Sequence, residues 1–180
     1  MLSITIPARE LYDEQTNEFI YEKEQTLELE HSLLSLSKWE SKWHKPFLGK
    51  EPLTLEQTID YVRCMTLTRN VDPKVYDRLT NGNIKAVEEY IEAPMTATWF
   101  PKESKGKNTG KQITNELIYY WMVALQIPFE CEKWHLNRLF TLIKVCNAEN
   151  KPKKKMSRQE VLSQNAALNA ARRKKLNSKG

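Results

Sequence analysis

Glycine is scarce in this sequence, with five residues in 180. Phosphate-binding loops depend on glycines at fixed spacing, because their backbone N–H groups must approach the phosphates closely. One segment, Gly106–Lys111, has a superficial likeness to such a loop, but only three residues separate its glycines and Gln112 follows the lysine. The GxxxxGK[ST] pattern is therefore absent, and we expect a polar, exposed loop over 102–111.

Long apolar runs are also missing. The longest, Leu117–Leu125, has nine residues, whereas a helix that crosses a bilayer needs roughly 20. Residues 1–7 lack the positively charged flank and the long apolar core of a signal peptide. Together with a mean hydropathy of -0.64, these features predict a helix-rich cytoplasmic protein with no membrane partner.

Cysteine and histidine are few, with three of each. No CxxC spacing occurs, and we expect reduced, buried thiols. Cys131, His135 and Cys146 are predicted to share one face of a helix, but the last two would lie about 16 Å apart along its axis, too far for one ion. No glycine-flanked nucleophile is present either. The sequence therefore predicts no catalytic residues, no cofactor and no metal, and hence a protein that is not an enzyme.

Charges of opposite sign are concentrated at the two ends of the chain. Residues 151–180 contain ten Lys or Arg and a single acid, Glu160. Residues 1–150 contain eighteen basic and twenty-two acidic residues, and eight of these acids lie in the first thirty positions. The body is therefore mildly acidic, although the whole chain has a formal net charge of +5. This polarity favours an electrostatic partner or head-to-tail association between copies.

Length and composition predict one globular domain over 1–150 and a basic tail over 151–180 that is partly helical or disordered. Within the domain, residues 1–31 are β-rich and residues 32–150 have helical spacing of apolar side chains. The expected fold class is α+β, mostly α-helical, with a small N-terminal antiparallel β-sheet, a helical bundle and a basic C-terminal extension.

Three segments of the first 31 residues have strand character. They are 2–6, 19–21 and 26–30, with turns expected at 13–17 and 22–24. So small a sheet is unstable by itself, and we expect the following helices to cover it.

The helices are predicted from apolar spacing, capping residues and proline. Their expected ranges are 32–44, 54–65, a short segment from Asp72, 84–91, 113–126, 128–147 and 157–174. Capping boxes at Thr54–Gln57 and Ser157–Glu160 define two of the starts, and Pro128 favours a third. Asn81-Gly82-Asn83 is expected to form a turn. The last helix has a thin face, mostly alanine, and we expect it to be marginal alone.

Two sets of residues are candidate contacts with a partner. The basic set of the tail comprises Lys153, Lys154, Lys155, Arg158, Arg172, Arg173, Lys174 and Lys175. The tail has no aromatic residue, so any contact with nucleic acid would be to phosphate. Trp39 and Trp43, interleaved with lysines, form either a contact face for protein or bases, or a buried face whose lysines stay in water. Trp99-Phe100 forms either an exposed anchor or a pair buried against the helices, and burial is the expectation.

Four stretches of the chain resemble a family of small proteins from tailed bacteriophages. They are Leu33–Trp43 (LLSLSKWESKW), Ile118–Met122 (IYYWM), Lys133–Arg138 (KWHLNR) and Asn165–Arg173 (NAALNAARR). The family accompanies virion-morphogenesis genes and is similar to tail-assembly chaperones. The resemblance implies a small adaptor in the host cytoplasm that binds the tape-measure protein or other tail subunits, and it implies no individual functional residue.

Two alternatives from other classes stay open. A structural virion protein of the tail or connector would use its basic tail to engage the acidic first thirty residues of a neighbouring copy, and would form a stable homo-oligomer. A nucleic-acid-binding phage protein would bind phosphate through the tail, with an affinity that falls steeply as salt is added.

Overall fold

The structure is a computed structural model that describes residues 1–14, 17–49, 51–100, 112–150 and 157–176. Among these residues helices predominate, and the four strands all lie in the first 29 positions. The predicted α+β class with a small N-terminal antiparallel sheet is confirmed. The chain divides into two compact units, Met1–Asn147 and Ala148–Gly180, beside the point where the charge changes sign. The loop predicted over 102–111 lies outside the described residues.

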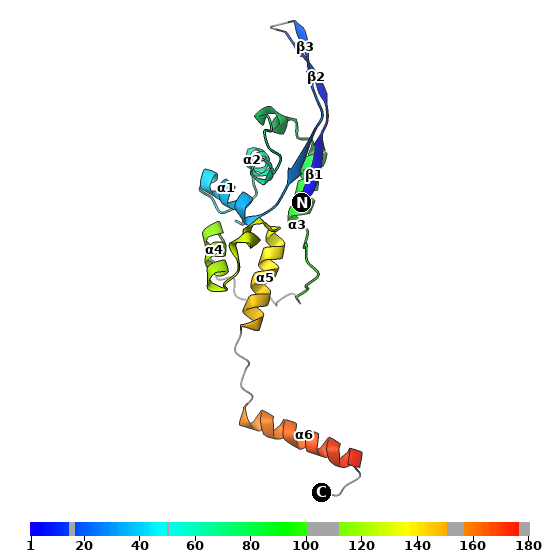
Figure 1. The fold of residues 1–180 in the computed structure, drawn as a ribbon, viewed down its shortest axis with the longest axis vertical. Helices are drawn as coiled ribbons and strands as arrows, with labels where there is room; N and C mark the ends of the chain where they lie inside the picture. The colour runs from blue at the N-terminus through cyan, green and yellow to red at the C-terminus, as the bar shows by residue number, and fades with distance from the viewer. Residues whose placement is uncertain (15–16, 50, 101–111, 151–156, 177–180) are drawn as a thin grey trace. The chain divides into compact units, whose positions relative to one another are not determined.

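The four strands form two antiparallel pairs that continue one another as a long hairpin (Figure 1). They are β1 (Leu2–Ile6), β2 (Arg9–Asp13), β3 (Glu18–Glu22) and β4 (Gln25–Leu29). The register is the same in both pairs, since Ile6 lies opposite Gln25 and Arg9 lies opposite Glu22. The ladder pauses at Pro7, which has no N–H to donate. We call the β1–β4 pair the base and the β2–β3 pair the arm.

Three of these strands were predicted, whereas β2 was not. Its sequence, RELYD, has three charged residues in five and only Leu11 and Tyr12 as apolar positions. The turn predicted over 13–17 is therefore one residue too long at its start, because Asp13 belongs to β2 and pairs with Glu18.

The base is covered on one face and along the outer side of β4. Its buried side chains are Ile4, Ile6, Leu27 and Leu29. The segment that follows α2 runs beside β4, and the N–H of Leu67 donates to the carbonyl of Glu28 at 2.7 Å. On β1, the Asn83 side-chain amide donates to the carbonyl of Thr5 at 3.1 Å. The expected cover of the sheet by helices is thus present for this half of the ribbon.

The first two helices begin where their capping residues predict. α1 spans Leu33–Trp43 and α2 spans Leu55–Met65. The hydroxyls of Ser32 and Thr54 each accept the backbone N–H of the residue three positions later in the chain. Both helices thus begin with a capping box. α1 ends at His44, which adopts the left-handed conformation with a φ of 51°.

The short helix predicted from Asp72 and the helix predicted over 84–91 are both present, but the second begins three residues earlier than predicted. A 3-10 helix, η1 (Pro73–Arg78), is followed by α3 (Asn81–Glu92). The turn predicted at Asn81-Gly82-Asn83 is wrong, because these residues form the first turn of α3. The Asn83 side chain accepts the N–H of Thr80 at 3.1 Å and completes a third capping box. Thr80, which precedes a composition typical of turns, was the residue that indicated a helix start.

The helix predicted over 128–147 is two elements. After α4 (Asn115–Ala124), a 3-10 helix η2 covers Phe129–Lys133, and α5 begins only at Leu136 and runs to Glu149. Between them, His135 forms a β-bridge with Ser32. This pairing joins segments about a hundred positions apart in the chain, so local spacing does not reveal the break.

The break separates residues that the sequence placed on one helical face. Cys131 lies in η2, His135 in the break and Cys146 in α5, so the prediction of one shared face is wrong. All three cysteines are free thiols, but only Cys131 is buried, while Cys64 and Cys146 are partly exposed. The expectation of three buried thiols therefore holds for one of them.

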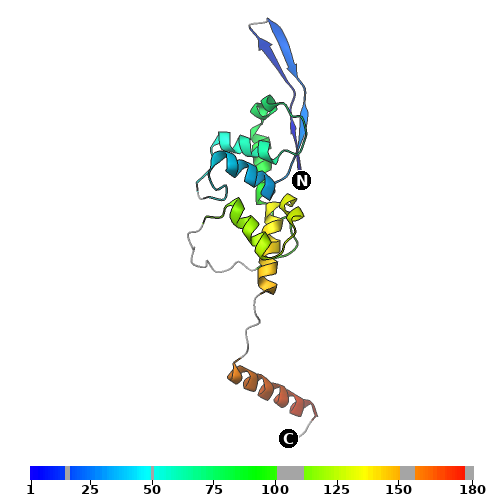
Figure 2. The same cartoon turned by 60° about the vertical axis from the view of Figure 1, so that its left-hand side comes forward.

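α1 lies between two hydrophobic cores. The first contains Trp39 and Tyr61 and lies against the base, α2, η1 and α3. The second contains Leu33 and Leu36 of α1 together with side chains from α4, η2 and α5, which lie on the other side of α1 from the ribbon (Figure 2). Phe47, in the turn after α1, packs against both cores. The first unit is therefore assembled around α1.

In the second unit, α6 spans Arg158–Leu176, close to the predicted 157–174. Every α6 side chain whose burial is described is exposed, consistent with the thin apolar face in its sequence. In the described parts of both units, no helix has the length and apolar character needed to cross a membrane.

Candidate partner-binding surfaces

The described residues hold no cluster of three His, Cys, Asp or Glu side chains with the geometry of a metal site. The buried polar and titratable groups are instead hydrogen-bonded to one another and to the backbone. Two such clusters join the two cores.

The first cluster surrounds two buried histidines. His31 Nδ1 and the Tyr61 hydroxyl share a hydrogen bond of 2.5 Å, and the His31 ring meets the His135 ring edge-on with centroids 5.1 Å apart. His135 Nε2 donates to the carbonyl of Tyr90 at 3.0 Å, while its Nδ1 accepts the N–H of Asn137 at 3.3 Å. Both nitrogens of His135 are therefore engaged as they are in a neutral imidazole.

Burial determines the protonation of this cluster. Burial, and secondarily the neighbouring His135, lowers the pKa of His31 to about 3. Burial also lowers the pKa of His135 and raises the pKa of Tyr61. All three groups are uncharged at neutral pH, and their partners lie within the fold. We interpret the cluster as structural.

The second cluster is centred on the buried carboxylate of Glu40. Its Oε2 accepts the backbone N–H of Asn115 at 2.8 Å and the side-chain amide of the same residue at 2.7 Å. Its Oε1 accepts the N–H of Phe47 at 2.8 Å. Asn115 is the first residue of α4, so the carboxylate also places negative charge at a helix N-terminus. Glu40 therefore joins α1 to α4, a role that no local sequence signal indicates.

The two tryptophans proposed as contacts have different surroundings. Trp39 is fully buried, and its indole N–H donates to the carbonyl of Gln57 at 3.0 Å. It has no surface to offer a partner, so its prediction as a contact residue is wrong. Trp43 is half-buried, stacks on Trp39 with centroids 6.1 Å apart, and donates its indole N–H to Asp60 at 2.9 Å. The buried-face interpretation applies to this helix.

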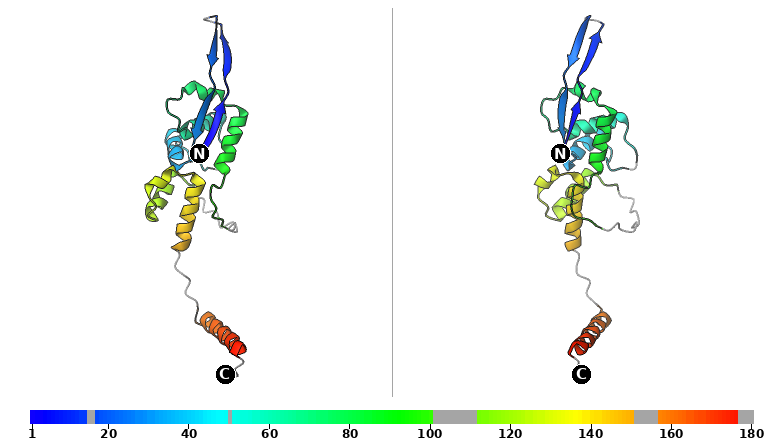
Figure 3. Two further views of the ribbon diagram at one scale, coloured as in Figure 1. Left: turned by 45° about the vertical axis from the view of Figure 1, so that its right-hand side comes forward. Right: turned by 90° about the vertical axis from the view of Figure 1, so that its right-hand side faces the viewer.

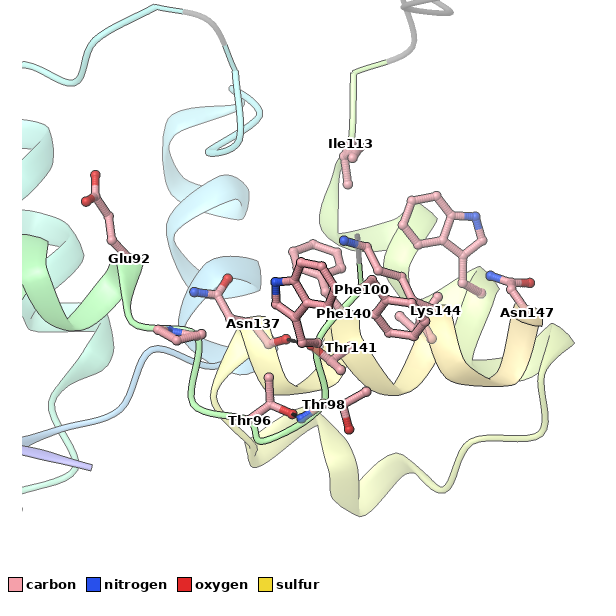
Figure 4. Close-up of a pocket in the computed structure, with 14 residues that line it drawn as sticks. Glu92, Thr96, Thr98, Phe100, Ile113, Asn137, Phe140, Thr141, Lys144 and Asn147 are labelled. Atoms are coloured by element: carbon pink, nitrogen blue, oxygen red, sulfur yellow. Dashed lines mark hydrogen bonds between the residues drawn. The ribbon is translucent and has the colours of Figure 1, made fainter. Parts of the chain in front are cut away.

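A groove of about 660 Å³ opens between the segment that follows α3 and the side of α5 (Figure 4). Its aromatic lining consists of Trp99, Phe100, Trp121 and Phe140. Lys144 and Glu92 are its only charged lining residues among those described. Trp99 is 79% exposed, so the expectation that it is buried is wrong. An open groove with four aromatic side chains, in which the described residues bring no titratable groups together, is suited to binding an apolar segment.

The arm exposes apolar side chains on both faces. Leu11, Tyr12, Phe19, Ile20 and Tyr21 are between 39% and 70% exposed. Opposed residues of a ribbon point to the same side, so Tyr12, Phe19 and Tyr21 share one face and Leu11 and Ile20 share the other. The Tyr12 and Phe19 rings lie 5.0 Å apart between centroids. Figure 3 shows that the arm extends beyond the helices that cover the base.

Arg78 lies at the point where the ribbon leaves the helices. Its Nη1 donates to the carbonyls of Pro7 and Lys23, each at 3.3 Å, and its Nε lies 3.5 Å from a carboxylate oxygen of Glu22. Glu22 also accepts from Arg9 Nε at 3.0 Å. Both strands are thus held from η1 where the ladder pauses, and neither this contact nor the arm was predicted from the sequence.

α6 carries the described part of the predicted basic set. Its exposed cations are Arg158, Arg172, Arg173, Lys174 and Lys175. Lys153, Lys154 and Lys155 lie outside the described residues. The larger apolar side chains of α6 are Val161, Leu162, Leu168 and Leu176, and all are exposed. At the helical spacing these four fall within about 120° of arc, and Arg158 and Arg172 fall in the same sector. The helix therefore presents a narrow stripe that is both apolar and basic.

The chain matches no family model, no curated protein and no solved structure.

Proposed function

We propose that the chain is a non-enzymatic tail-assembly chaperone or related morphogenesis factor of a tailed bacteriophage, which binds the tape-measure protein or another tail subunit. The observation that carries the proposal is the aromatic groove beside α5. A tape-measure protein is a long chain that offers helices with apolar faces, and such helices bind in grooves through a few anchoring side chains. A transient cover of this kind keeps the partner from aggregating before assembly.

The engagement of the buried polar groups supports binding over catalysis. His31, His135, Tyr61 and Glu40 each make hydrogen bonds that join elements of the first unit. A catalytic acid or base has to reach a substrate, whereas these side chains are enclosed by the fold. The described residues that line the groove, in turn, are uncharged except for Lys144 and Glu92.

The test measures whether the full chain captures purified, overlapping fragments that together cover a tape-measure protein of the same phage. Trp99→Ala is the informative variant, because Trp99 is the most exposed aromatic side chain of the groove. Loss of an interface tryptophan typically costs 2 kcal/mol or more, which is about a 30-fold loss of affinity. Tyr120→Ala is the matched control, since Tyr120 is an exposed aromatic of α4 that does not line the groove.

Weakened capture by Trp99→Ala with unchanged capture by Tyr120→Ala would support the proposal. Equal capture by both variants, or no capture of any fragment by the unmodified chain, would reject it.

The basic residues of α6 favour nucleic-acid binding as a second candidate. Five exposed cations on one helix can neutralise phosphates without reading bases. This candidate predicts that affinity for duplex DNA of any sequence falls linearly on a log–log plot against salt, and that Arg172→Glu with Arg173→Glu flattens the slope. An affinity that does not change with salt would exclude it.

A further inference from the structure

The arm combines exposed apolar side chains with negative charge. Acids with described side chains are Glu10, Glu14, Glu18, Glu22 and Glu24, and the cations are Arg9 and Lys23. Arg9 is already paired with Glu22. A two-stranded ribbon is marginal in water unless a further element packs on it. The described residues supply such an element to the base and none to the arm, which marks the arm as a surface that a partner covers.

The charge of the arm restricts what can cover it. Two arms from different copies would bring their glutamates together, and like charges directly opposed in a sheet are destabilising. The occupant must therefore be cationic, and it must also have apolar side chains to set against Tyr12, Phe19 and Tyr21.

α6 has both properties. Its apolar stripe shares one sector with Arg158 and Arg172, which lie about 21 Å apart at 1.5 Å per residue. The strands of the arm have five residues each, or about 17 Å. A helix with this stripe can therefore set its apolar residues on the aromatic face of the arm, which Glu10 shares, and bring its arginines close to the acids of the arm.

We propose that the arm of one molecule is the docking site for α6 of a second copy. The contact joins different surfaces of the two molecules, so it leaves one arm and one α6 unpaired in every pair. Repetition of such a contact generates a ring if the rotation closes and a filament if it does not. The proposed chaperone role does not require this self-association, and the groove takes no part in it.

The test is the mass of the full chain by sedimentation velocity across a concentration series at about 0.1 M salt, where the Debye length is about 10 Å. We expect association that increases with concentration and weakens in 1 M salt. Glu10→Lys with Glu18→Lys reverses charge on the arm, and Arg172→Glu with Arg173→Glu reverses it on α6. Each double variant alone should sediment as a monomer.

Mixing the two double variants distinguishes this contact from a general effect of charge. In the mixture, the α6 variant supplies a native acidic arm and the arm variant supplies a native basic α6. The basic arm and the acidic α6 of the two variants are also complementary, so association should return. A control with Glu88→Lys and Glu89→Lys changes the charge equally on exposed positions of α3 and should associate as the unmodified chain does.

Three results would overturn the proposal. They are a monomeric full chain at all concentrations, association that survives either reversal, and variants that stay monomeric when mixed. Association that disappears after nuclease treatment would likewise show that nucleic acid, not the arm, bridges the copies. Capture of tape-measure fragments by the arm variants is measured in parallel, so failure of this contact and failure of the chaperone proposal give different results.

Discussion

The base and the arm of the β-ribbon have the same strand length, the same register and comparable apolar content, yet only the base is buried. Leu27 in the base has no exposed surface, whereas Leu11 in the arm is 39% exposed. The difference lies in the surroundings, because α2, α3 and the segment after α2 pack on the base. An apolar strand is therefore not by itself evidence of a core position. Where no helix or loop packs on such a strand, its exposed apolar side chains indicate an interface.

The largest expected effect comes from a matched pair of leucines. Leu27→Ala should lower the free energy of unfolding by about 2–5 kcal/mol, because it leaves a cavity among side chains that cannot fully relax. Leu11→Ala should change it by less than about 0.5 kcal/mol. Urea unfolding of the full chain followed by circular dichroism measures both. Equal losses would mean that the arm is packed in solution as the base is.

A second comparison sets Glu40 against an exposed glutamate. Glu40→Ala should destabilise the protein by about 3 kcal/mol, because two backbone N–H groups and one side-chain amide lose a charged acceptor while buried. Glu88→Ala, on the exposed side of α3, is the control and should be nearly neutral. A neutral result for Glu40 would show that water replaces the carboxylate and that α1 and α4 are not joined through it.

Lowering the pH should reduce the free energy of unfolding of the first unit, because it contains the buried His31. The folded-state pKa of His31 is about 3, below the ordinary 6.5, so between these values the unfolded chain binds a proton that the folded chain does not. Stability is therefore full above pH 6.5 and falls as the pH decreases, by about 1.4 kcal/mol per unit for one such group.

Urea midpoints at pH 7 and pH 5 measure this slope, and His31→Asn should reduce it while keeping a group able to bond Tyr61. The lowered pKa of His135 contributes in the same direction. If the variant and the original chain lose stability equally between the two pH values, His31 is not the source.

The smallest expected effect is at the junction of base and arm. Arg78→Ala should cost about 1 kcal/mol in global stability, because it removes the hydrogen bonds to Pro7 and Lys23. Hydrogen exchange should accelerate more for amides of the arm than for those of β1 and β4, which the helices still cover. Arg69→Ala, which alters an exposed arginine, is the control. Uniform acceleration in both halves would mean that Arg78 stabilises the whole ribbon.

Local sequence signals predicted those elements whose ends are determined locally. Thr54 defined the start of α2, because a capping side chain bonds to a residue only three positions away, and the helical spacing of apolar residues predicted α1. The same reasoning applied to Thr80 would have placed the start of α3 at Asn81 and not at Ile84, had the Asn-Gly-Asn composition not favoured a turn.

The features that the sequence did not reveal depend on distant contacts. The break at His135 pairs with Ser32, and the apolar spacing continues through it unchanged. Glu40 has an ordinary position on a helix, and its role comes from Phe47 and from the distant Asn115. Trp39 is buried and Trp99 is exposed, although burial was expected for Trp99, because tertiary packing decides which aromatic side chains are covered.

The shared position of α1 has a consequence for how the first unit unfolds. Because α1 supplies Trp39 to one core and Leu33 and Leu36 to the other, neither core can melt without exposing part of its neighbour. Heat or urea should therefore produce a single cooperative transition over residues 1–147. For the same reason, in a polypeptide cut between α3 and α4, the fragment with α4 and α5 would fold only when combined with the fragment that carries α1, because Leu33 and Leu36 complete its core.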